Sequence, residues 1–90
     1  MLKIHHQTSF KKDVKLAKKR GKDLEKLKAV IEKLVANEPL GPKHRDHELV
    51  GNYKYYRECH IEPDWLLIYK LEEDMIIFVR TGTHSDLFKK

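Results

Sequence analysis

The sequence contains little that could cross-link the chain and no segment suited to crossing a membrane. Its 90 residues include a single cysteine, Cys59. This excludes an intramolecular disulfide, so the fold does not depend on an oxidising compartment. No apolar run approaches the roughly 20 residues that a transmembrane helix needs, and the N-terminal residues lack the pattern of a signal peptide. We therefore expect one small domain, residues 1–90, in the cytoplasm.

Common catalytic and metal-binding motifs are also missing. The sequence has no glycine-rich phosphate loop, CxxC pair, HExxH motif or nucleophile elbow. Its three prolines and four glycines fall mostly within residues 37–52, a stretch that also carries His44 and His47. So long a connection in a small domain is commonly functional, which predicts an ordered functional loop.

Acidic residues are scarce in the first half of the chain. Residues 1–45 carry 13 Lys/Arg against 5 Asp/Glu, a balance of +8, whereas residues 46–90 carry 6 against 9, a balance of −3. A basic half suits a polyanion or an acidic partner protein, but lysines also keep a helix surface soluble. The charge alone leaves both interpretations open.

Two segments show apolar residues at helical spacing. The apolar stripes consist of Phe10, Val14 and Ala17 in the first segment, and of Leu24, Leu27, Val30, Ile31, Leu34 and Val35 in the second. Thr8 or Ser9 can cap the first helix and Asp23 the second. Gly21 suits the end of the first helix, so the two segments are expected to form a helical hairpin.

Four other segments are predicted strands, at residues 2–6, 53–60, 65–71 and 75–80. The last two are apolar on both faces for most of their length, as is typical of central strands. The order of elements predicts an α+β fold, β-α-α-β-β-β, with the two-helix hairpin on one face of a small, mainly antiparallel four-stranded sheet. Leu87 and Phe88 are expected to form a short apolar plug at the end.

Histidines and acids are predicted to meet at one end of this sheet. Glu62-Pro63 has turn chemistry, because proline fixes φ and cannot donate to a strand ladder. The turn is expected to set His60 opposite Asp64, and the last strand returns to the same rim and delivers His84. His47 enters at the far end of the preceding strand, so its loop must fold back to reach them.

Such a rim has the parts for cleaving RNA without a metal ion. A base removes the 2′-hydroxyl proton and an acid protonates the leaving 5′-oxygen, and two imidazoles with pKa values of about 6.5 can share this work. Arg57 and Arg80 are candidates for holding the phosphate. An exposed aromatic residue, Trp65 or Phe88, is a candidate for stacking an unpaired base.

Two other uses of these residues stay open. His47, His60, Asp64 and His84 would also make a plausible zinc set, although nothing in their spacing is diagnostic. Each histidine taken alone is also consistent with a plain rim residue or a loop donor.

Several motifs closely resemble the YafQ branch of the RelE/ParE toxin superfamily, and the similarity covers nearly the whole chain. These motifs are Asp46-His47 with Leu49 and Gly51, the run His60-Ile61-Glu62-Pro63-Asp64-Trp65, Leu67-Ile68-Tyr69-Lys70, and Arg80-Thr81-Gly82-Thr83-His84 with Leu87-Phe88. The run Asp13-Val14-Lys15-Leu16-Ala17 and the order of elements are also similar to that branch.

The resemblance implies a RelE-like fold and the toxin of a bacterial type II toxin–antitoxin pair. Such toxins cleave mRNA in the ribosomal A site and are silenced by a small antitoxin protein. The implied catalytic set is His47, His60, Asp64 and His84, with Trp65 and Phe88 shaping the site. The implied attack by the 2′-hydroxyl needs neither a metal ion nor another cofactor.

The alternative is a toxin of the ParE type, which poisons gyrase or the ribosome by binding it without cleavage. Relatives of that type lack the histidine set, so its presence here favours RNA cleavage. The role of His44 does not follow from the sequence, nor does the division of acid and base work between the histidines.

Overall fold

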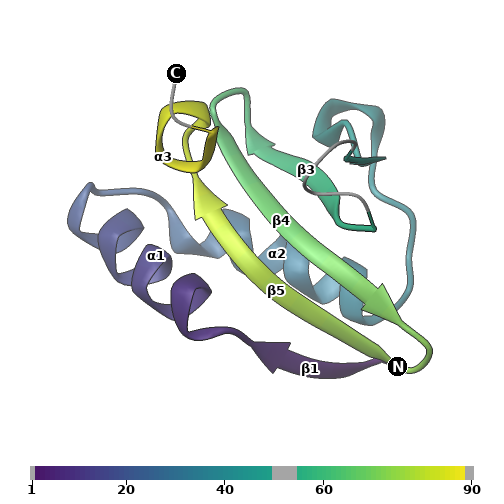
Figure 1. Ribbon diagram of the computed structural model, residues 1–90. Helices are drawn as coiled ribbons and strands as arrows, with labels where there is room; N and C mark the ends of the chain where they lie inside the picture. Colours follow the sequence, from purple (N-terminus) through teal and green to yellow (C-terminus); the bar gives the residue numbers. More distant parts are fainter. Residues whose placement is uncertain (1, 50–54, 89–90) are drawn as a thin grey trace.

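The structure is a computed structural model that describes residues 2–49 and 55–88. Its two long helices pack against one face of a sheet (Figure 1). The strands are β1 (Lys3–His6), β2 (His47–Glu48), β3 (Arg57–Glu62), β4 (Trp65–Glu72) and β5 (Met75–Gly82). The helices are α1 (Thr8–Lys19), α2 (Leu24–Val35) and α3 (His84–Phe88), with a short 3₁₀ helix, η1 (Pro42–His44). None of the helices in these ranges is long and apolar enough to cross a membrane.

Local signals mark the end of α1 and the beginning of α2. Gly21 has φ +77° and closes α1, because the next N–H, of Lys22, bonds to the Ala17 carbonyl at 3.0 Å. Asp23 caps α2 as predicted, accepting the Glu25 N–H at 3.0 Å. The prediction that Thr8 or Ser9 caps α1 was wrong. Its N-cap is Gln7, with no side-chain cap, and Ser9 lies inside the helix.

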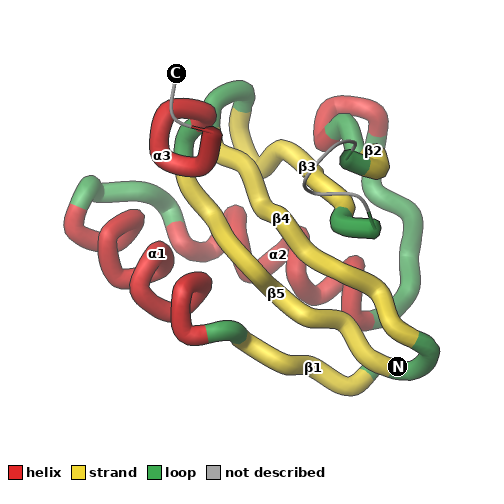
Figure 2. The backbone as a smooth tube through the Cα atoms, in the orientation of Figure 1, coloured by secondary structure: helices red, strands yellow, loops and turns green. Residues whose placement is uncertain are grey.

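The sheet has five strands in the order β1-β5-β4-β3-β2. β1 pairs in parallel with β5, and the other pairs are antiparallel. The predicted α+β architecture is confirmed, but the count of four strands is wrong, because β2 forms inside the expected loop and pairs with the start of β3. Figure 2 shows this short strand at the edge of the sheet.

The ends of several predicted elements also differ. β3 begins at Arg57 rather than residue 53, since Tyr55 has φ +80° and cannot continue a strand; residues 50–54 lie outside the described part. β5 runs two residues further than predicted, to Gly82. The expected apolar plug is the helix α3, in which Leu87 is buried and Phe88 partly buried.

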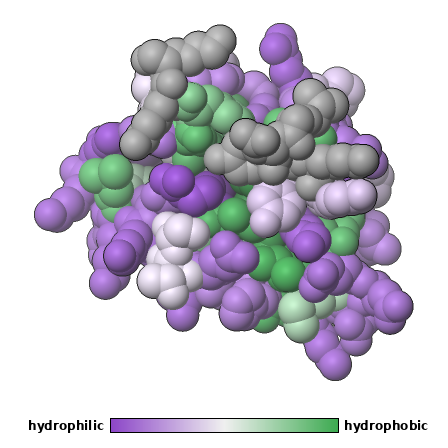
Figure 3. Space-filling model, viewed as in Figure 1, coloured by the Kyte–Doolittle hydropathy of each residue, from purple (hydrophilic) through white to green (hydrophobic). Residues whose placement is uncertain are grey.

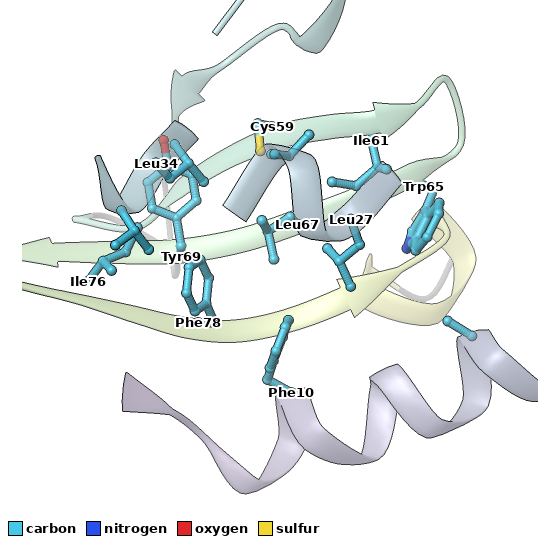
Figure 4. Packing of buried hydrophobic residues seen from close by; sticks show 13 residues of the cluster. Phe10, Leu27, Leu34, Cys59, Ile61, Trp65, Leu67, Tyr69, Ile76 and Phe78 are labelled. Atoms are coloured by element: carbon cyan, nitrogen blue, oxygen red, sulfur yellow. The ribbon is translucent and has the colours of Figure 1, made fainter. Parts of the chain in front are cut away.

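Apolar residues fill both faces of the central strands. On the helix side, Trp65, Leu67 and Tyr69 of β4 pack in one cluster with α1, α2 and their neighbouring strands (Figure 4). On the other side, Leu66 and Ile68 pack with Leu87 of α3 and Val79 of β5 in a second cluster. The space-filling view shows apolar residues between hydrophilic ones in the middle of the molecule (Figure 3). The prediction of two central strands is therefore confirmed.

Side chains of α1 bond to backbone groups of β5 beyond the point where β1 ends. Ser9 donates its hydroxyl to the Val79 carbonyl at 2.7 Å, and Asp13 accepts the Thr81 N–H at 3.1 Å. Asp13 also binds the Arg80 guanidinium at 2.6 Å. These bonds satisfy strand groups that would otherwise lack a partner, and they fix the end of β5 just before His84.

Candidate functional site

One half of the site is built on β3 and β2. Successive strand residues point to opposite faces, so Glu58 and His60 share the face away from α2, whereas Cys59 and Ile61 face the helices. Glu58 is 6% exposed, and its Oε1 lies 3.2 Å from His60 Nε2 and 3.3 Å from His47 Nε2. One buried carboxylate therefore holds two imidazoles.

β2 is what brings His47 into this half. His47 pairs with Glu58 across the β2–β3 ladder, which sets the two side chains on the same face of the sheet. The prediction that the loop must fold back is therefore confirmed: His47 reaches the site through Glu58. Its side chain remains about half exposed, at 51%, so it sits at the outer rim.

The other half is built on the β3–β4 turn and the start of α3. Pro63 and Asp64 form the two-residue turn. Asp64 Oδ1 accepts a hydrogen bond from the His84 backbone N–H at 2.9 Å and lies 2.5 Å from His84 Nδ1. These two hydrogen bonds hold the pKa of the Asp64 carboxyl below its usual value, the backbone bond contributing most. Asp64 thus stays ionised and holds the ring of His84.

The orientation of His84 is fixed further by the first turn of α3. Thr83 and Asp86 cap each other, since Asp86 accepts the Thr83 N–H at 3.0 Å and Thr83 Oγ1 accepts the Asp86 N–H at 3.1 Å. Arg20 at the end of α1 binds Asp86 at 2.6 Å and lowers the pKa of that carboxyl to about 2. A Cβ at Gly82 would lie 3.0 Å from the Asp86 side chain, so a larger residue there would push against the carboxylate that caps α3.

The two halves meet at His60 and His84. Their ring centroids are 5.8 Å apart with an interplanar angle of 61°. The predicted approach of His60, Asp64 and His84 at one rim is confirmed, but one detail is wrong. Asp64 bonds to His84, and the carboxylate beside His60 is Glu58. Sequence reasoning missed Glu58, although its position two residues before His60 on a strand was a usable signal.

The two predicted phosphate-binding arginines already hold carboxylates. Arg57 Nε lies 3.3 Å from Asp46 Oδ1, and Asp46 also accepts the Tyr69 hydroxyl at 2.6 Å. Arg80 binds Asp13 at the opposite edge of the sheet, as described above. Arg57 alternates with Glu58 along β3 and bonds to the Tyr69 hydroxyl, so it lies on the helix-facing side of the strand, opposite to His60.

The two predicted aromatic residues differ in exposure. Trp65 is 1% exposed, so the expectation of an exposed ring at this position was wrong. Its Nε1 donates to Thr81 Oγ1 at 3.0 Å, and that hydroxyl donates to the Leu66 carbonyl at 2.6 Å. Trp65 therefore supports the end of β5 from within the core. Phe88 is partly buried beside the second apolar cluster.

The site also contains donors that suit a metal ion. Among the described residues, His47, Glu58 and His60 each offer one ligand atom, and these atoms lie within 4.8 Å of one another. Two imidazoles and a carboxylate are a common donor set for zinc or copper. Asp64 and His84 are not part of this group, so the four-residue zinc set considered from the sequence does not come together as such.

A comparison with protein families matches residues 2–89 to the bacterial toxins of type II toxin–antitoxin systems called YafQ. The mRNA interferase toxin YafQ of Escherichia coli strain K12 is 50% identical over 86 residues, which cover 94% of each chain.

Solved structures agree with this match. The E. coli DinJ–YafQ complex contains a chain that superposes with a TM-score of 0.92 at 48% identity, covering 98% of this chain and 99% of that one. A copper-bound mutant toxin from Helicobacter pylori superposes with a TM-score of 0.93 at 44% identity, covering 98% of this chain and all of that one.

Proposed function

The chain belongs to the YafQ family of type II toxins, and from that premise we propose that it cuts mRNA at the His60–His84 rim while the message is on the ribosome. It is a toxin of a toxin–antitoxin system and an mRNA interferase, that is, an endoribonuclease. Its partner is an antitoxin protein, as in the DinJ–YafQ complex. Ribosomal dependence, cutting in the A site and a cytoplasmic place of action are parts of our proposal.

We assign the proton transfers to the two central imidazoles. One takes the proton of the 2′-hydroxyl, whose oxygen attacks the adjacent phosphorus, and the other protonates the 5′-oxygen as the P–O bond breaks. The products are a 2′,3′-cyclic phosphate and a free 5′-hydroxyl. His84 Nδ1 faces Asp64, which leaves Nε2 for the substrate. His60 Nε2 faces Glu58, which leaves Nδ1.

The remaining predicted residues have supporting roles in this proposal. His47 and Asp64 complete the catalytic set, His47 by sharing Glu58 with His60. Arg80 is the candidate ligand of the scissile phosphate, exchanging Asp13 for it as RNA binds. Arg57, predicted for the same role, faces the other side of β3 and is assigned to RNA phosphates beyond the scissile one.

The two aromatic residues differ in their proposed roles. Phe88 is the candidate for stacking a base, because it is partly exposed near His84. Trp65 shapes the site from beneath.

One observation carries the mechanism: the imidazoles of His60 and His84 lie 5.8 Å apart, and each contacts a different carboxylate, Glu58 or Asp64. This supports acid–base chemistry without a metal ion. The alternative is a toxin that binds its target without cleaving RNA. The E. coli relative does not support it, because that protein is named as an mRNA interferase.

Primer extension on a defined mRNA, translated by purified ribosomes, tests the proposal. We expect cuts at A-site codons with the wild-type protein, none with His84→Ala, and none when the scissile nucleotide is 2′-deoxy. Equal cutting of the same mRNA without ribosomes would contradict the ribosomal step. Growth arrest without any cuts would favour a binding toxin.

A further inference from the structure

A groove with a basic rim lies away from the histidine rim, between α2, η1 and the β3–β4 turn. Its volume is about 430 Å³. Val30 and Ile61, both buried, form an aliphatic floor, and Lys26, Lys33 and Lys43 stand around it with His44. Ile61 points to the helix face of β3, opposite to His60, so the groove and the catalytic rim lie on different faces of the same strand.

The charges of this groove are not balanced within the described residues. Its one lining carboxylate, Glu62, is already bound by Lys22 at 3.2 Å and by Lys26 at 2.9 Å. Lys33 and Lys43 are exposed and form no ion pair in the described part of the chain. An aliphatic floor with surplus cations suits a ligand that carries both an apolar side chain and acidic groups.

We propose that this groove receives an acidic segment of the antitoxin, with an apolar side chain on Val30 and Ile61 and Asp or Glu residues beside Lys33 and Lys43. The proposal rests on the toxin–antitoxin function stated above. Single-stranded RNA fits less well, because unpaired bases stack on aromatic rings and, among the residues that line the groove, only His44 has an aromatic ring. A peptide needs only the apolar floor and the cations.

The probe is the synthetic peptide acetyl-Glu-Asp-Leu-Glu-Glu-Leu-Asp-amide, titrated into ¹⁵N-labelled toxin and followed by NMR. We expect amide shifts around Ala29, Lys33 and Ile61. The double variant Lys33→Glu/Lys43→Glu should bind roughly tenfold more weakly, since two exposed charge contacts are reversed. Ala29→Gln should also weaken binding, because Ala29 is exposed and a longer side chain fills the groove without disturbing the core.

Lys28→Glu is the matched control, since Lys28 lies on the same helix but lines a different surface beside Glu25. Lys28→Glu is compared with the single variant Lys33→Glu, which changes the charge by the same amount, and it should leave the peptide affinity unchanged. Equal loss with Lys28→Glu and Lys33→Glu would overturn the proposal in favour of unspecific charge attraction. Groove shifts caused by hexauridylate but not by the peptide would assign the groove to RNA. mRNA cutting by the wild-type protein is measured separately. Failure of the groove proposal can therefore be distinguished from failure of the proposed function.

A second observation concerns His44, whose Nδ1 lies 2.7 Å from the His60 carbonyl. β2 pairs only with Arg57 and Glu58, so this carbonyl lies beyond the end of the β2–β3 ladder, where the strand also has a bulge between His60 and Glu62. η1 packs against β3 at this point. The side chain of His44 thus replaces a missing strand partner next to a catalytic imidazole.

The geometry points to His44 as a positioning residue that holds the His60 backbone, given the proposed chemistry at His60. His44→Ala should lower kcat roughly 10- to 100-fold with KM unchanged, because small displacements of a catalytic group are costly. His44→Asn should restore most of the rate, since its side-chain N–H can sit near the position of Nδ1. Native kcat in His44→Ala, or no rescue by a stably folded His44→Asn, would overturn the assignment.

Discussion

The two imidazole–carboxylate pairs of the rim consist of the same chemical groups but differ in burial. The side chains of His60 and Glu58 are 11% and 8% exposed, whereas those of His84 and Asp64 are 55% and 65% exposed. The buried pair comes from alternate residues of one strand. The exposed pair joins a turn to the first residue of a helix.

This difference separates two requirements of an acid–base site. A buried pair is held rigidly, but its polar groups must remain satisfied for the fold to be stable. An exposed pair bears little of the packing, and it can exchange protons with solvent and meet a large substrate. We therefore expect changes at the buried pair to affect both folding and cutting, and changes at the exposed pair to affect cutting alone.

The largest effect is expected from removing either imidazole. His84→Ala and His60→Ala should each lower the cutting rate by about 10²–10⁴-fold, the usual contribution of one acid or base. Thermal unfolding should separate them: His84→Ala should melt like the wild type, and His60→Ala should melt earlier because it leaves Glu58 without one partner. Full cutting by both variants would show that the catalytic assignment is wrong.

Removing the carboxylates should sharpen the same contrast in stability. Glu58→Ala should lower the free energy of unfolding by about 1–3 kcal/mol, since two imidazoles lose a buried hydrogen-bond partner. Asp64→Ala should leave urea unfolding unchanged, because its carboxylate is exposed. An equal loss in both variants would mean that the two halves do not differ as their exposure suggests.

A smaller effect is expected from neutralising Asp64 while keeping its shape. Asp64→Asn retains an acceptor for the His84 N–H but loses the charge, so cutting should fall roughly two- to fivefold, as for an exposed ion pair. The pKa of Asp64 is lowered in the folded protein, so its bond to His84 is intact above the usual carboxyl pKa and is lost as pH falls through the lowered value. Rate–pH profiles should show this acid limb in the wild type and not in Asp64→Asn.

The smallest effect is expected from chelation. Because the proposed chemistry uses no metal ion, EDTA should leave the cutting rate unchanged. Added Zn²⁺ should inhibit reversibly, since His47, Glu58 and His60 can bind it and His60 is then unavailable for proton transfer. Activity that disappears in EDTA and returns with zinc would contradict the acid–base proposal.

The sequence was sufficient for the helices and the central strands, because their apolar periodicity is strong. It was insufficient for β2, a strand of two residues that has no pattern of its own and forms only by pairing with β3. The burial of Glu58 depends on that pairing. An acidic residue on an amphipathic strand is otherwise expected to face solvent, which is why the partner of His60 was assigned incorrectly.

Trp65 shows a second limit. It was expected to be an exposed ring for stacking a base, but the turn takes only Pro63 and Asp64, and Trp65 already pairs with Glu62 at the start of β4. Strand alternation then sets Trp65 on the same face as Leu67 and Tyr69, toward the helices. The face of a residue next to a turn depends on the exact turn length, which sequence patterns fix poorly.

The parallel pairing of β1 with β5 has a consequence for when the toxin can act. Lys3 pairs with Met75, so the first and last strands must meet before the sheet is complete. Contacts so distant in sequence close slowly, because the chain between them loses conformational entropy first. His84 follows β5 directly, and it can approach His60 only once β5 has joined β4. A growing chain therefore carries no assembled rim until its last strand has been synthesised, which separates the making of this toxin from its activity in time.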